Sequence, residues 1–471
     1  MRSVVILLSF GLAGCATAPA YRPPEVQVPS AFRELRDTIV VAPAAVTTTA
    51  APAEWGEVGD TTLTRLIKEA AGANLDIRAA EARVRRARSA RTEAALDLAP
   101  TVTFAGGYTR QRLSSATFPI GAGTFPDQDI WDGGFDAFWE LDLFGRVRRN
   151  VQAQGAFVAV NQQDLRDIQV SLTAELARAY FELRGAQEQL MVARRNAENQ
   201  QRTLGLTRER LEAGRGTAFD TERAQAQLSF TLASVPGLEA RVRQAQYQIG
   251  VLVGRPPAAV AGELDAVAPL PSLPGTVAVA SPDSVVRRRP DVAAAERQLA
   301  VERALVGAAR ADYLPRITMG GSAGYSASRF NSLGDRGTFR YAVGPIVSWP
   351  ALNLGRIKAR VDQTRAREAE AQAQYDQTVL RALQEVETAL VRYRTARAQV
   401  DRIQDAATAS ERAAELARLR FTGGVADFLQ VLDAERTQLE AQDQLARGRT
   451  EAATAYAALY KALGGTLDPL N

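Results

Sequence analysis

The chain has 471 residues, 46% of them apolar, and its 57 basic residues nearly balance 53 acidic ones, which leaves a net charge of +4. This balance argues against a dedicated nucleic-acid-binding protein, which would concentrate basic residues on one face. The chain has no histidine and one cysteine, which excludes Ser-His-Asp triads, histidine metal sites and intrachain disulfides.

The N-terminus has the pattern of a secretory signal peptide. Arg2 precedes the apolar stretch Val4–Leu12, which is too short to span a bilayer, and small residues then lead to Cys15. The order Leu-Ala-Gly-Cys resembles a bacterial lipoprotein signal, in which the cysteine is acylated and becomes the first residue. We therefore expect residues 1–14 to be removed and Cys15 to carry lipid, including palmitate. Residues 15–60 would form a lipidated N-terminal extension, in which residues 38–52 have no assigned role.

The rest of the chain contains two related halves. The stretch WELDLFGRVRRN from Trp139 aligns with WPALNLGRIKAR from Trp349, 210 residues later, and the same offset places Gly214 on Gly424. This internal similarity indicates a duplication. It predicts two structural repeats, residues 61–257 and 281–464, which are joined by a linker, residues 258–280. Residues 465–471 would form a C-terminal tail.

Each predicted repeat begins with a helix, Thr61–Asp97 or Ser281–Asp312, which a proline ends. Two strands follow, and then a long proline-free helix with apolar residues at steps of three and four, Arg146–Glu212 or Arg356–Thr422. At 1.5 Å per residue each long helix would reach about 100 Å, too long for a globular core. The pattern therefore predicts an elongated helical bundle or cylinder.

A glycine turn at Gly214 or Gly424 separates each long helix from the last helix of its repeat. The last helices are expected over Phe219–Val253 and Asp427–Leu463. Pro236 lies inside the first of them and predicts a kink.

Four segments alternate between apolar and polar residues and have aromatic residues near their ends, which predicts strands with one apolar and one polar face. They are Thr101–Tyr108, Phe135–Leu143, Ile317–Ala327 and Phe339–Pro350. Each has about the length of a tilted membrane-spanning strand. The loops Leu113–Ile130 and Arg329–Gly337 would face the cell exterior, and Pro345 suggests a bulge or bend.

Four strands cannot close a barrel around a channel. An open sheet edge in lipid would leave unpaired backbone groups, each costing several kcal/mol. If these strands cross a membrane, several chains must therefore share one barrel.

The chain contains the cysteine signal and the stretches EWGEVGDTTLTRLI, WELDLFGRVRR, VLVGRPP, RRRPDVAAAERQL, ADYLPRITMGGSAGY and FLQVLDAER. Together they resemble the TolC-like outer-membrane factors, and more narrowly the lipoprotein branch, the NodT family, that serves resistance-nodulation-division efflux pumps. The resemblance implies a mostly α-helical trimer in which four strands per chain form a twelve-stranded transmembrane barrel on a long periplasmic α-helical barrel. It also implies a passive exit duct for drugs or other small molecules, which works with a periplasmic adaptor protein and an inner-membrane pump and needs no cofactor beyond the lipid on Cys15.

The resemblance also places a periplasmic gate at the two glycine turns, Gly214 and Gly424. Asp433 matches the family's ring-forming aspartate, and Asp220 matches an acidic position at the tip of the first repeat. Phe421 stands where some members have tyrosine, so a latch that depends on the tyrosine hydroxyl is not expected here.

The strand-to-helix junctions are expected at the aligned residues Gly145 and Arg146 in the first repeat and Gly355 and Arg356 in the second. These four positions would connect the barrel to the long helices.

Three other functions compete with an efflux duct. An outer-membrane duct for type I protein secretion would share the architecture, and a coiled-coil envelope scaffold would share the helices but needs no lipid-facing strands. An enzyme is suggested by the G-x-S-x-G pattern at residues 320–324, but a nucleophile elbow needs a strand-to-helix turn and a histidine base. We therefore expect no enzymatic activity.

Overall fold

The computed structural model describes residues 28–34, 39–41, 58–114, 126–274 and 277–465. The predicted signal peptide, Cys15 and residues 42–52 lie outside these described residues. The chain divides into two compact units. The first contains Arg83–Gln162 and Ala294–Asp376, and the second contains Val26–Ala82, Gln163–Ala293 and Gln377–Asn471, so each unit draws on both halves of the sequence.

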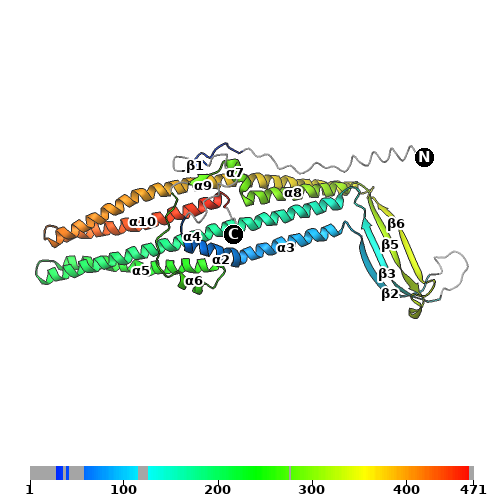
Figure 1. Cartoon of the computed structure of the whole chain (residues 1–471), viewed down its shortest axis with the longest axis horizontal. Helices are drawn as coiled ribbons and strands as arrows, with labels where there is room; N and C mark the ends of the chain where they lie inside the picture. Colours follow the sequence, from blue (N-terminus) through cyan, green and yellow to red (C-terminus); the bar gives the residue numbers. More distant parts are fainter. Residues whose placement is uncertain (1–27, 35–38, 42–57, 115–125, 275–276, 466–471) are drawn as a thin grey trace. The chain divides into compact units, whose positions relative to one another are not determined.

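The fold is mostly helical with a small antiparallel sheet, which confirms the predicted fold class (Figure 1). The helices are α2 (Thr61–Ala73), α3 (Leu75–Leu96), α4 (Arg146–Glu212), α5 (Ala218–Val253), α6 (Pro257–Glu263), α7 (Pro282–Arg288), α8 (Pro290–Ala311), α9 (Leu354–Thr422) and α10 (Phe428–Ala462). Within the described ranges, no helix has the length and apolar character needed to cross a bilayer. α5 continues through Pro236.

The two helices predicted to open the repeats are each divided in the structure, so those two predictions were wrong. Asn74 separates α2 from α3: its side-chain oxygen accepts hydrogen bonds from the backbone N–H of Asp76 and Ile77, and its amide donates to the Leu252 carbonyl oxygen over 2.8 Å. Arg289 separates α7 from α8 in an extended conformation, which the following Pro290 favours.

The sheet belongs to the first unit and has the strand order β2-β3-β5-β6, all antiparallel (Figure 1). Its strands are β2 (Thr101–Gln111), β3 (Gln128–Glu140), β5 (Arg316–Ala327) and β6 (Phe339–Ser348). β3 begins earlier than predicted, because Gln128 to Ile130 pair with the end of β2, and it ends before Leu141, where the chain turns toward α4.

The bulge expected at Pro345 is absent. Pro345 pairs with Met319 in an unbroken register. β6 and β2 are the two edges of the sheet.

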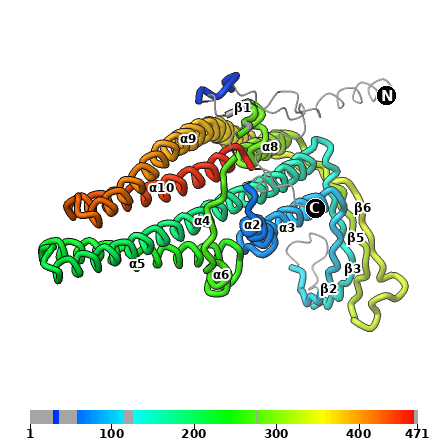
Figure 2. Tube along the Cα trace, turned by 60° about the vertical axis from the view of Figure 1, so that its left-hand side comes forward, coloured from blue at the N-terminus to red at the C-terminus, as the bar shows by residue number. Residues whose placement is uncertain are grey.

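The core of the second unit confirms the apolar stripes predicted in the two long helices. Leu176 and Leu183 of α4 and Val386 and Leu390 of α9 are fully buried in one cluster, together with side chains from α2, α5 and α10. The two hairpins, α4–α5 and α9–α10, run along this unit with their turns at the same end (Figure 2).

A short N-terminal segment packs against α9 in the second unit. Phe32 is buried, and the Glu387 carboxylate accepts hydrogen bonds from the backbone N–H of Arg33 and Glu34 over 2.8 and 3.1 Å. Glu34 also pairs with Arg394 over 2.8 Å. β1 (Ile39–Val41) then forms a parallel pair with β4 (Val277–Val279), an element not predicted from the sequence.

Candidate functional site

The two glycine turns expected at the gate have the same backbone structure. Gly214 and Gly424 follow α4 and α9 with φ of 68° and 74°, a conformation that favours glycine. In each turn the next residue donates its N–H to a carbonyl five positions back, from Arg215 to Arg210 and from Val425 to Arg420. This hydrogen bond satisfies a free carbonyl at the helix end and fixes the reversal of the chain.

Phe421 lies between the two hairpins. It is 7% exposed, its ring centroid lies 5.6 Å from that of Phe428, and the Arg210 guanidinium sits 4.3 Å from its ring centroid. Arg210 belongs to the first hairpin and Phe421 to the second. A cation–π contact therefore joins the hairpins beside their turns. Phe421 has no hydroxyl group, so its ring alone makes this contact.

The two predicted gate aspartates each pair inside their own hairpin. Asp433 is 69% exposed at its side chain and lies 3.1 Å from Arg436, three residues along α10. Asp220 lies in the first turn of α5, where its carboxylate accepts the hydroxyl of Thr217, the N-cap residue, over 2.7 Å. Both carboxylates remain accessible to a further cationic partner.

A row of buried polar contacts between α4 and α10 was missed in the sequence. Thr203 donates its hydroxyl to Glu435 over 2.8 Å, and the Asn196 side-chain amide donates to Gln442 over 3.0 Å. Arg418 also donates to Glu435 over 2.9 Å, so this buried carboxylate is satisfied by both hairpins. Gln189, Gln200 and Thr207 of α4 are buried polar residues as well, so no local pattern sets Asn196 and Thr203 apart in the sequence.

The two strand-to-helix junctions differ more than their alignment suggests. Gly145 has φ of 79°, and Arg146 forms a two-pronged ion pair with Glu140 over 3.0 and 2.6 Å. Gly355 lies inside the first turn of α9 with open space around its Cα, and Arg356 is exposed. Only the first junction of this aligned pair therefore requires a glycine.

Asp142 fixes the first junction. It has a positive φ of 42° and is buried, and its carboxylate accepts the backbone N–H of Val147 and Arg148 at the start of α4. Negative charge at a helix N-terminus is favourable there, which accounts for an aspartate in this position.

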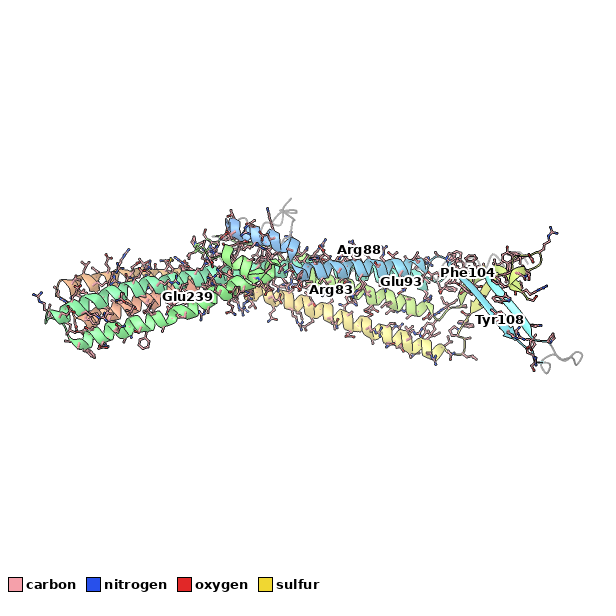
Figure 3. All side chains as sticks on the ribbon, turned by 90° about the horizontal axis from the view of Figure 1, so that it is seen from below. Arg83, Arg88, Glu93, Phe104, Tyr108 and Glu239 are labelled. Atoms are coloured by element: carbon pink, nitrogen blue, oxygen red, sulfur yellow. The ribbon has the colours of Figure 1, made fainter. Side chains whose placement is uncertain are left out.

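One face of the sheet is apolar and exposed. Phe104 and Phe135 pack edge-to-face with ring centroids 5.3 Å apart, and the tilted rings of Tyr108 and Trp131 have centroids 4.5 Å apart. Figure 3 shows Phe104 and Tyr108 on β2. Other large apolar residues on this face are Val102, Trp139, Met319, Tyr325, Phe339, Tyr341, Val343 and Val347, all exposed by at least a third. Charged residues of the helices, such as Arg83, Arg88 and Glu93 on α3, are also exposed in the same unit (Figure 3).

The opposite face carries hydroxyl, glycine and charged residues. Asp132 lies 3.6 Å from Arg340 there. Phe138 and Ile346 interrupt this polar face: both lie over Gly320, where an added Cβ would lie 3.7 and 3.1 Å from them. The G-x-S-x-G pattern of the enzyme alternative lies inside β5, not at a strand-to-helix turn.

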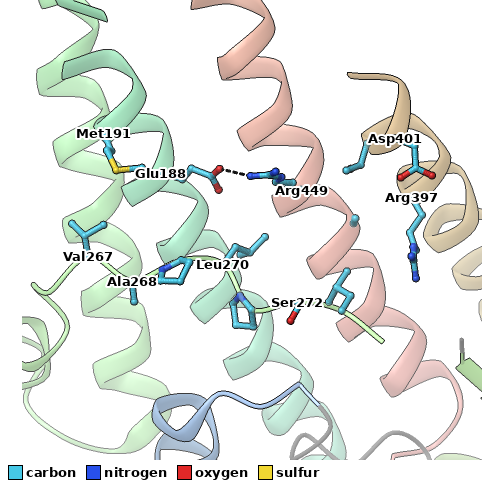
Figure 4. A pocket seen from close by; sticks show the side chains of 14 residues that line it. Glu188, Met191, Val267, Ala268, Leu270, Ser272, Arg397, Asp401 and Arg449 are labelled. Atoms are coloured by element: carbon cyan, nitrogen blue, oxygen red, sulfur yellow. Dashed lines mark hydrogen bonds and ion pairs between the residues drawn. The ribbon is translucent and has the colours of Figure 1, made fainter. Parts of the chain in front are cut away.

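A cavity of about 630 Å³ lies in the second unit beneath residues 267–273, in the predicted linker. Its wall includes the ion pair of Glu188 with Arg449, 2.9 Å apart (Figure 4). None of the predicted gate or junction residues lines this cavity.

Comparison with known proteins shows the family. Residues 66–255 and 282–465 match the model described as outer membrane efflux protein. Nodulation protein T of Rhizobium leguminosarum bv. trifolii is 28% identical, over 98% of this chain and 96% of its own. Outer membrane protein OprJ of Pseudomonas aeruginosa is 30% identical, over 98% of this chain and 95% of its own.

Solved structures agree with the sequence relatives. The outer-membrane channel OprN is 36% identical with a TM-score of 0.88, covering 97% of this chain and 100% of its own. The open state of the MtrE outer membrane channel of Neisseria gonorrhoeae is 27% identical with a TM-score of 0.81, covering 96% of this chain and 98% of its own. The resemblance to NodT-type outer-membrane factors is thereby confirmed, and this chain belongs to the outer membrane efflux protein family.

Proposed function

We propose that three copies of this chain form the outer-membrane exit duct of a tripartite efflux pump. The duct passes drugs or other small molecules from the periplasm to the exterior, while an inner-membrane pump supplies the energy through a periplasmic adaptor protein. Relatives named as outer membrane components of antibiotic and toluene efflux pumps, 30% identical to this chain, support this function. The chain acts as a passive conduit and not as an enzyme.

The four-stranded sheet is the observation that carries the proposal. Its apolar face exposes large side chains such as Phe104 and Tyr341 (68% and 74% exposed), and its edges β2 and β6 each have one neighbour. Unpaired edges are costly in lipid. Pairing β6 of one copy with β2 of the next satisfies both edges and closes a barrel of three copies.

The polar face supports a water-filled interior. Asp132, Asp136, Ser322 and Arg340 alternate with the apolar residues along their strands, so closing the barrel with the apolar face outward turns them toward the lumen. A wet lumen suits a conduit for molecules of different shape.

The gate lies at the hairpin turns. In a trimer Asp433 and Asp220 would each occur three times around the axis, where crowded carboxylates select cations or are bridged by arginine. The contact between Arg210 and Phe421 holds the two hairpins together in the closed state. Opening separates the hairpins near Gly214 and Gly424.

The lipid on Cys15 anchors the N-terminus in the outer membrane, so the helices lie on the periplasmic side. Gly145, Arg146, Gly355 and Arg356 mark where strands lead into helices at the membrane boundary. The anchor is tested by replacing Cys15 with serine: acyl labelling should disappear, and labelling that persists contradicts lipidation.

The function is tested with the detergent-purified particle in planar bilayers and with a deletion strain. We expect discrete ion conductance from the particle, and drug sensitivity of the strain that the gene reverses. A coiled-coil scaffold would give no conductance. A type I secretion duct would restore export of a protein and leave drug sensitivity unchanged.

A further inference from the structure

The loop between β5 and β6 folds back onto the apolar face of the sheet. Phe330, in a short 3₁₀ turn (Phe330–Ser332), packs edge-to-face against Trp131 of β3 with ring centroids 5.1 Å apart. Leu333 approaches Gly133 on the same strand, where its terminal methyl lies 3.8 Å from the position of an added Cβ. Trp131, Gly133 and Phe135 alternate onto one face, so the loop covers the exposed apolar face.

Leu333 fills a gap in that face. Gly106 and Gly133 are paired across β2 and β3, and neither has a side chain to contribute to the surface. The Phe104 ring leans over Gly106, 3.5 Å from the position of an added Cβ, and Leu333 lies over Gly133. The loop therefore completes the apolar surface where the strands leave it open.

The loop holds this position through its own hydrogen bonds. Thr338 donates both its N–H and its hydroxyl to the Asp335 carbonyl, over 3.1 and 2.8 Å, and its hydroxyl accepts the Gly334 N–H over 3.2 Å. Thr338 also accepts the Ser326 N–H through its carbonyl oxygen over 2.9 Å, which ties the loop to the end of β5. A loop fixed in this way presents Phe330 and Leu333 to one side.

We propose that this loop, residues 328–338, contacts membrane lipid in the outer leaflet and is not an aqueous surface loop. The inference rests on the proposed barrel, in which the apolar face of the sheet meets lipid. Gly133 lies two residues from Phe135 along β3, a distance of about 7 Å. Leu333 therefore lies near the loop end of the exposed apolar face, which would form the apolar belt of the barrel. Phe330 is 67% exposed beside Trp131, where aromatic rings concentrate at a membrane interface.

The rest of the loop has the chemistry of a headgroup contact. Arg329, Asp335 and Arg336 are exposed, and long arginine side chains reach from an apolar surface to lipid phosphates. The loop thus combines an apolar side, Phe330 and Leu333, with a charged side, as expected for a segment at the boundary between acyl chains and headgroups.

The test uses spin labels on variants of the full chain that each add one cysteine to Cys15, in vesicles of phosphatidylethanolamine and phosphatidylglycerol. Labels at Phe330→Cys and Leu333→Cys report on the loop, Val343→Cys on the apolar belt, and Asp335→Cys on the charged side. The wild-type chain gives the background from Cys15. Collision rates are measured with oxygen, which concentrates in lipid, and with a water-soluble nickel complex.

We expect the oxygen-to-nickel collision ratio at Phe330→Cys and Leu333→Cys to be several-fold higher than at Asp335→Cys and close to that at Val343→Cys. If Val343→Cys favours oxygen while both loop labels favour nickel, the lipid-contacting loop is wrong and the barrel stands. If Val343→Cys also favours nickel, the proposed barrel fails, and the loop inference fails with it.

Discussion

Gly134 and Gly324 face each other on β3 and β5 at a distance that excludes any side chain. A Cβ added to Gly134 would lie 2.7 Å from the Ala323 carbonyl oxygen and 2.8 Å from the Gly324 Cα. A Cβ added to Gly324 would lie 2.6 Å from the Gly134 Cα. The two central strands of the sheet therefore depend on this pair of glycines for their close approach.

Replacing either glycine by alanine should disrupt the sheet. The strands would have to separate, at a cost of about 1–3 kcal/mol for an overpacked site. We expect Gly134→Ala and Gly324→Ala to lower the yield and melting temperature of the assembled particle, measured by size exclusion and thermal unfolding. Gly107→Ala is the matched control, because no atom lies within 4 Å of its added Cβ; a loss as large in this control would show that the close approach is not the cause.

The contact of Arg210 with Phe421 should hold the gate closed. A cation–π contact contributes about 0.5–2 kcal/mol, so Arg210→Gln or Phe421→Leu should raise the open probability of the particle in planar bilayers. Arg208→Gln is the control, since Arg208 bonds to Gln225 within the first hairpin. Unchanged gating in both test variants would remove this contact from the closed state.

The gate aspartates should also limit conductance. We expect Asp433→Ala, alone and with Asp220→Ala, to raise the conductance of the isolated particle, because it removes carboxylates that arginine can bridge across the axis. Glu411→Ala removes one negative charge from an exposed position in the same hairpin and should have no effect. Equal conductance in wild type and in the double variant would exclude the aspartates from the gate.

Asp167 should make stability depend on pH. Burial, with a smaller contribution from Asp291, raises the pKa of this α4 carboxyl above its usual value. The folded state then favours the protonated form, so ionisation costs stability as the pH rises through the raised pKa, and the cost is absent below about pH 3.8, where both states are protonated.

Asp167→Asn should therefore raise the melting temperature modestly at neutral pH and lose this advantage in acid. Glu175→Gln, an exposed change on the same helix, should show neither effect. Melting curves of the particle from acid to neutral pH measure this difference. A gain in melting temperature for Asp167→Asn that does not vary with pH would contradict the raised pKa of Asp167.

Much of the fold could be predicted because its signals are local. Gly145 and Gly214 bracket α4, which spans the predicted Arg146–Glu212, and period-two alternation located the four strands of the larger sheet. The break at Arg289 had a local signal in Pro290 that was overlooked, whereas the break at Asn74 depends in part on a distant partner. Asn74 donates to Leu252, and the buried Arg289 pairs with Glu385 and donates to the Ala462 carbonyl.

The candidate site was predictable in part for the same reason. Glycine at the end of a long helical pattern favours a left-handed turn, so Gly214 and Gly424 were found. The contacts that join the hairpins could not be found from local patterns, because their partners are far apart along the chain; Thr203 and Glu435 are separated by 232 residues. Phe138, on the polar face, was missed because alternation alone does not report the space above Gly320.

The mass of the protein component in the detergent-purified particle is the most direct measurement, obtained by light scattering or native mass spectrometry. Closure of the edges β2 and β6 by neighbouring copies predicts three chains in each particle, each of 50.7 kDa less the mass of the removed residues 1–14. A stable particle of one chain that stays dispersed without detergent would contradict the shared barrel.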